Sequence, residues 1–225
     1  MLGVLSYDQI LDQLTASFNL SFSNGRIPPV RMVGIIFARP ESPLAAKEIV
    51  PNLDYFHYRS GEHIDFFCAG YGADYADDPD RKSQINVGDV GWKFNPNRFN
   101  AILKAMEKRS DWKYSGGTDL ILTNARFDPA TSRVSLDSES VMKCYLDEMI
   151  RIKAIPSVEE FFERIIKYAK SASGDDPTWG FSDSEGLHAG KRSLINVVLS
   201  LLPKEIGEEL KRVAVFAASK GRRPA

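Results

Sequence analysis

The sequence predicts an α/β protein with a helix before its sheet-forming core and an all-helical extension after it. Over residues 31–154, apolar runs rich in β-forming residues alternate with segments of helical periodicity, as in a sheet covered by helices. After residue 155 the apolar residues recur at helical spacing alone. We therefore divide the chain into residues 1–30, 31–154 and 155–225.

The composition is that of an ordinary globular protein. Of the 225 residues, 43% are hydrophobic and 26% charged, which is enough to bury a sizeable core. With 29 basic and 30 acidic side chains the net charge is −1, which gives no overall attraction to nucleic acid or to an anionic membrane. No N-terminal stretch has the pattern of a signal peptide, and two cysteines are too few for a disulfide framework. We expect a cytoplasmic protein without a cofactor, a membrane span or a nucleic-acid partner.

A helix and a buried strand are expected first. Ser6 has the residue type of an N-cap, and apolar residues then recur at helical spacing. These apolar residues are Ile10, Leu11, Leu14 and Phe18. Residues 32–38 form a near-continuous apolar run, as expected for a strand covered on both faces.

A second helix and a second strand follow. Ser42 and Pro43 have the residue types of an N-cap and of a first helical position, so a helix should begin there. Pro51 lies in its interior and should kink or split it, because proline lacks the backbone donor. Residues 64–69 predict a strand parallel to the first, with the helix crossing one face of the sheet between them.

A long loop is expected over residues 70–91, and Asn95 with Pro96 should then open a third helix. Residues 118–127 predict another strand of the same sheet, and a short strand near residues 133–136 should complete an antiparallel hairpin.

The core should close with a helix capped by Asp137 or Ser138. Its inward face would include Val141, Tyr145, Leu146, Met149 and Ile150. Beyond the core, Ser157 should cap a helix over residues 158–170, and residues 173–186 predict a turn-rich linker.

The last part of the chain predicts two helices, over residues 194–202 and 203–218. The first is apolar around nearly its whole circumference, so it must be covered on more than one side. Either the core of the same chain covers it, or a protein partner or a second copy does. The candidate interface residues are Val198, Leu202 and Phe216.

The order of elements over residues 32–150 resembles the thioredoxin fold. Pro51 lies midway along the first crossover helix, where thioredoxins have a kinking proline. Residues 118–136 resemble the final hairpin of that family, and residues 135–150 (SLDSESVMKCYLDEMI) resemble its closing helix. The resemblance covers roughly half of the chain.

The same resemblance implies that the family's redox chemistry is missing. Counting from Pro51, the two redox cysteines of the family fall at Pro43 and Ala46, and its cis-proline falls at Gly117. No thiolate can form at these positions, so dithiol exchange is excluded. The resemblance therefore implies a redox-inactive thioredoxin-like protein. Together with the apolar C-terminal helices, the missing redox pair predicts an interaction or assembly subunit.

The two cysteines of the chain are expected to be structural. Cys68 shares a strand face with Ile64 and Phe66, and an apolar surrounding raises the pKa of a thiol and makes it inert. Cys144 lies next to Tyr145 and is expected to be buried on its helix in the same way.

Two further groups of polar residues have weaker patterns. The acidic loop contains Asp74, Asp77, Asp78 and Asp80. It lacks the alternation and the glycine of a calcium loop, so we predict a solvated loop and no metal, with a bound cation as the alternative. His63 and Asp65 lie on one strand face, but at the start of the strand, whereas ligands bind beyond the carboxyl ends.

The best place for a ligand site is where the first two strands end. Arg39 and Ser42 follow the first strand, and Tyr71 and Asp74 follow the second. Ser42 also begins a helix, whose free N–H groups attract anions. The alternative function is therefore a hydrolase or transferase acting on a phosphate- or carboxylate-bearing substrate at these four residues.

Overall fold

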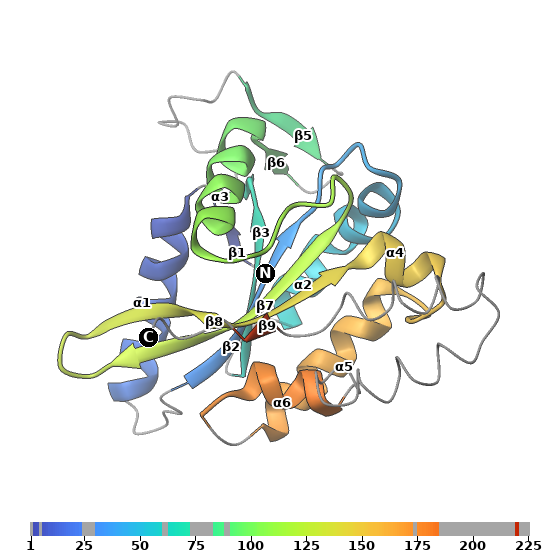
Figure 1. The fold of residues 1–225 in the computed structure, drawn as a ribbon. Coiled ribbons are helices and arrows are strands. Elements are labelled where there is room, and N and C mark those ends of the chain that lie inside the picture. The colour runs from blue at the N-terminus through green and yellow to red at the C-terminus, as the bar shows by residue number, and fades with distance from the viewer. Residues whose placement is uncertain are drawn as a thin grey trace, which may run out of the picture.

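The computed structural model describes residues 2–4, 6–23, 30–59, 63–72, 83–87, 91–172, 175–184 and 219–220. Its main sheet has the strand order β1-β3-β2-β7-β8-β9 (Figure 1). The strands are β1 (Leu2–Val4), β2 (Val30–Phe37), β3 (Ile64–Ala69), β7 (Asp119–Asp128), β8 (Arg133–Tyr145) and β9 (Ser219–Lys220). β3 runs parallel to both β1 and β2, whereas β7 is antiparallel to β2, β8 to β7, and β9 to β8. The prediction that the first two core strands are parallel and share a sheet with the third is confirmed.

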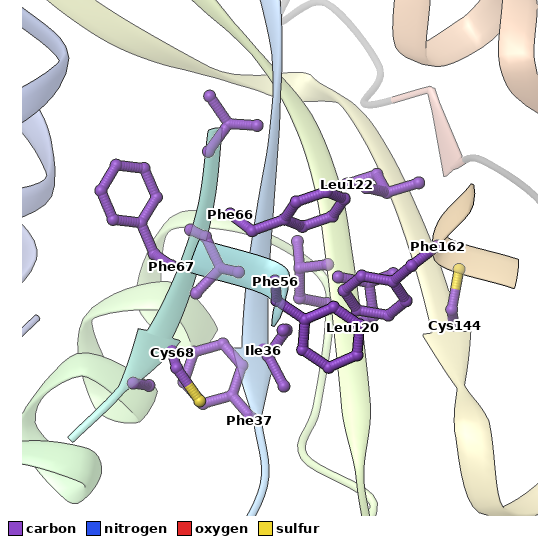
Figure 2. Close-up of a cluster of buried hydrophobic side chains, with 14 of the residues drawn as sticks. Ile36, Phe37, Phe56, Phe66, Phe67, Cys68, Leu120, Leu122, Cys144 and Phe162 are labelled. Atoms are coloured by element: carbon purple, nitrogen blue, oxygen red, sulfur yellow. The ribbon is translucent and has the colours of Figure 1, made fainter. Parts of the chain in front are cut away.

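Helices cover both faces of this sheet (Figure 1). One face holds α1 (Tyr7–Ser23) and α3 (Pro96–Arg109); the other holds η1 (Ala45–Ile49), η2 (Val50–Asn52), α2 (Leu53–Arg59), α5 (Val158–Ser171) and α6 (Pro177–Ser184). Successive strand residues supply the two cores because they point to opposite faces. The Phe66 ring stacks on Phe162 of α5, with centroids 4.7 Å apart, while Phe67 points to the other side of β3 (Figure 2).

The predicted caps at Ser6 and Asn95 and the split at Pro51 are confirmed. The Gln9 backbone N–H donates to Ser6 Oγ (3.0 Å), and Asn95 Oδ1 accepts from the backbone N–H groups of Asn97 and Arg98, the second and third residues of α3. Around Pro51 the helix changes from a π-turn (η1) to a 3₁₀ turn (η2) before it becomes regular in α2. Proline has no backbone N–H to donate, and these turns accommodate it because their hydrogen bonds have a different spacing from those of an α-helix.

The predicted closing helix from Asp137 or Ser138 is wrong. β8 continues to Tyr145, and only Leu146–Arg151 (α4) is helical. Val141 and Tyr145 are four residues apart, a spacing that fits a helix but also falls on one face of a strand. Pairing with β7 decides between the two, and Cys144 is therefore buried on a strand opposite Leu120 rather than on a helix.

Other predicted irregular segments contain secondary structure. Part of the expected loop over residues 70–91 is a small antiparallel sheet of β4 (Tyr71–Gly72), β6 (Trp92–Phe94) and β5 (Ile85–Val87). The expected linker contains α6, which Asp176 caps by accepting from the Trp179 backbone N–H (2.9 Å). β1 and β9 were not predicted either, since strands of three and two residues have no periodicity to detect.

Candidate functional site

The end of β2 brings together two loops that are far apart in the sequence. Ser42 precedes the helix that contains η1, and Thr118 precedes β7. Their hydroxyl oxygens lie 3.5 Å apart, so the start of this helix faces the loop before β7. We call this place the rim; it is formed by Arg39, Ser42 and Thr118.

Arg39 is held at the rim by its neighbours. Its guanidinium lies over the Phe99 ring, 4.8 Å from the centroid, and its Nη2 donates to Asn100 Oδ1 (3.0 Å). Nη1 is 3.8 Å from a Glu41 carboxylate oxygen, and one third of the side chain is exposed. The guanidinium is thus oriented and accessible, but Glu41 offsets part of its charge.

Tyr71 does not take part in an accessible site. It is fully buried, and its hydroxyl donates to the Ala38 carbonyl oxygen (2.9 Å). Burial raises the pKa of this phenol far above its usual value. The structure therefore brings Arg39 and Ser42 together at the rim but uses Tyr71 to tie the end of β2 to β4. Asp74 and the rest of the acidic loop lie outside the described residues.

The loop before β7 is organised by a buried carboxylate that sequence reasoning missed. Asp119 accepts hydrogen bonds from Trp112 Nε1 (3.1 Å), from the Ser115 backbone N–H (2.9 Å) and from the Ser115 hydroxyl. Burial raises its pKa to about 6, although these hydrogen bonds oppose the shift. An acidic residue directly before the apolar residues 120–122 was the available signal.

The backbone polar groups of the same loop form hydrogen bonds within the chain. The Gly117 N–H donates to Ser115 Oγ (3.1 Å), and the Gly117 carbonyl accepts from the Tyr114 hydroxyl (2.6 Å). The Thr118 N–H donates to Asp147, and its carbonyl accepts from the Leu146 N–H (2.9 Å). Thr118 is itself fully buried, so the rim offers the side chains of Arg39 and Ser42, rather than free backbone groups, to a ligand.

Both cysteines are fully buried, as predicted (Figure 2). Burial raises the pKa of the Cys68 thiol well above its ordinary value. Cys68 lies on β3 and Cys144 on β8, with β2 and β7 between them, so the two thiols cannot approach each other.

The His63–Asp65 pair does not form a site. Asp65 is buried, and Arg31 Nη1 donates to its Oδ2 (3.0 Å), while His63 is exposed at the start of β3. Arg31 also donates to Ser17 Oγ of α1 (2.9 Å), so this ion pair fixes α1 to the sheet. Within the described ranges no group of three or more histidine, cysteine or acidic side chains is placed to hold a metal.

The predicted interface residues Val198, Leu202 and Phe216 lie outside the described residues. In the part of the chain that the structure describes, none of the helices combines the length and apolar character needed to cross a bilayer. Compared with protein-family models, with curated proteins and with solved structures, the chain matches none.

Proposed function

We propose that this chain is a redox-inactive thioredoxin-like protein that works as a protein-protein interaction or assembly subunit. The parallel pair β2–β3, the antiparallel hairpin β7–β8 beside it and the crossover helix divided at Pro51 support the fold assignment. The proposal rests on the rim: Ser42 and Thr118 face each other there, at the helix start and loop that the resemblance assigns to thiol chemistry.

The chemistry at this place supports binding rather than electron transfer. Pro43 and Ala46, both exposed, occupy the positions of the family's redox cysteines. The chain's two cysteines are instead buried in the sheet, where a thiolate is strongly disfavoured. Without an accessible thiolate, disulfide exchange has no nucleophile.

A hydrolase or transferase acting on an anionic substrate is less well supported. Tyr71, one of its expected residues, is buried and bonded to the main chain, and Glu41 offsets part of the Arg39 charge. Support for a protein partner comes from the apolar residues 194–202, which need more cover than one neighbouring helix provides.

The first test measures thiol chemistry in the full chain. We expect no thiol that reacts rapidly with Ellman's reagent in the native protein, two in denaturant, and no reduction of insulin. The double variant Pro43→Cys/Ala46→Cys should gain a reversible disulfide, with a reduction potential roughly between −270 and −120 mV as in other members of the fold.

A matched control separates the position from the mere presence of two thiols. Gln9→Cys/Asp12→Cys places the same spacing in the first turns of α1, away from the rim, and should not reduce insulin. Insulin reduction by the wild-type chain would contradict the redox-inactive assignment. A rim variant that behaves like the α1 variant would contradict the thioredoxin-like placement.

A further inference from the structure

A cavity of about 370 Å³ lies between α1, α3 and the hairpin β7–β8. The two helices lie on the same face of the sheet (Figure 1), and the residues of the rim do not line this cavity. Its wall combines apolar side chains with charged and hydroxyl-bearing ones. The apolar wall residues are Leu11, Met106, Val134, Leu136 and Val141. The volume falls in the range of cavities that hold small molecules, roughly 300–1,000 Å³.

Two of the charged residues in the wall, one positive and one negative, have no ion pair in the part of the chain that the structure describes. Arg109 lies over the Tyr7 ring, with its Cζ 4.2 Å from the centroid, and its Nη1 donates to the Ala105 carbonyl oxygen (3.1 Å). Neither Arg109 nor Asp8 has an ion-pair partner among the described residues, although both line the cavity. Both charges also act on the pKa of Tyr7, in opposite directions, so both lie near its ring.

The second acidic residue of the cavity is already neutralised. Asp137 Oδ2 is 2.8 Å from Arg126 Nη2, and Asp137 Oδ1 accepts from the Ser140 backbone N–H (3.2 Å). The charges left for a ligand are therefore one guanidinium and one carboxylate, which are not paired with each other. Hydroxyl groups of Ser110, Ser135 and Ser138 add further polar positions.

We propose that this cavity binds a zwitterionic α-amino acid with an apolar side chain. The ligand carboxylate pairs with Arg109, whose planar guanidinium suits that group, and the ammonium lies near Asp8. The apolar side chain contacts the wall between α1, α3 and β8. A polyanion such as phosphate is disfavoured by Asp8, and a simple amine leaves Arg109 unpaired. This inference does not depend on the proposed function of the rim.

The test is calorimetric titration of the full chain with L-phenylalanine and L-leucine. Two matched probes each lack one charged group: 3-phenylpropanoate has no ammonium, and 2-phenylethylamine has no carboxylate. We expect saturable binding of both amino acids, and binding of each matched probe weaker by about tenfold or more, because one charged residue of the site then has no partner. Inorganic phosphate should bind more weakly still.

Variants of Arg109 and Asp8 test which charged group of the ligand each residue binds. Arg109→Gln should weaken L-phenylalanine and 3-phenylpropanoate alike, by about tenfold, whereas Asp8→Asn should weaken L-phenylalanine and 2-phenylethylamine and leave 3-phenylpropanoate unchanged. Lys108→Gln and Asp12→Asn change exposed neighbours that do not line the cavity, and should leave the affinity unchanged. Absence of saturable amino-acid binding at millimolar concentration, equal affinity for 3-phenylpropanoate, or binding unaffected by Arg109→Gln would each overturn the proposal.

Discussion

Asp119 shows how a single buried carboxylate sets the shape of a loop. It ties Trp112 and Ser115 to the first position of β7, the strand that pairs with β2. Its raised pKa means that the folded state binds more protons than the unfolded chain between about pH 4 and pH 6. The contribution of Asp119 to stability therefore falls as the pH rises through this window, and its cost is complete above about pH 6.

We predict that Asp119→Asn removes this part of the pH dependence. Between pH 4 and pH 7, wild-type stability should fall by about 1–3 kcal/mol relative to the variant, since the amide does not ionise. Urea unfolding at a series of pH values measures the difference. Asp111→Asn, in the same loop but exposed, controls for the loss of one negative charge. Parallel stability curves for wild type and Asp119→Asn would contradict the prediction.

At the scale of elements, the sequence predicts the helices whose start or division is marked by a short local pattern. Ser6, Asn95 and Ser157 mark helix starts by their own chemistry, and Pro51 marks the divided helix. β8 was mistaken in part for a helix because pairing with β7, not local periodicity, holds residues 141–145 extended.

The rim was partly predictable for the same reason. Arg39 and Ser42 follow the end of β2, as the sequence indicates, whereas Thr118 is brought beside them by the antiparallel pairing of β2 with β7, which was not predicted from the sequence. The burial of Tyr71 and the hydrogen bonds of Asp119 depend on side chains from distant segments, such as Trp112. No short segment of the sequence contains the information needed to predict these contacts.

An element-scale prediction concerns the docking of α5. The Val158 N–H, in the first turn of α5, donates to Glu48 Oε2 of η1 (2.8 Å), so a neighbouring helix supplies part of the cap. Glu48→Ala should lower the free energy of unfolding by about 1–2 kcal/mol, because it leaves a helix N–H unpaired and removes a favourable negative charge. Lys47→Ala, at an exposed neighbouring position, should change it by less than about 0.5 kcal/mol. Equal effects of the two variants in urea unfolding would refute this docking role.

For the whole molecule, the central question is what covers residues 194–202. The following segment offers Ile206, Leu210, Val213 and Phe216 as one cover. These residues lie outside the described part of the chain, so the assembly role remains a proposal. We predict that the full chain self-associates or binds a protein partner through this segment.

For self-association, Val198→Asp/Phe216→Asp should reduce the mass measured by light scattering to that of a single chain, because charged groups cannot be buried in an apolar interface without a partner. Lys211→Asp, at a position predicted to face outward on the same helix, controls for added negative charge and should keep the wild-type mass. Thermal unfolding of the wild type, the double variant and Lys211→Asp distinguishes cover by the same chain from cover by another chain. An unchanged mass together with a large loss of stability in the double variant would place these residues in an intramolecular core. That result would remove the support that residues 194–202 give to an assembly subunit.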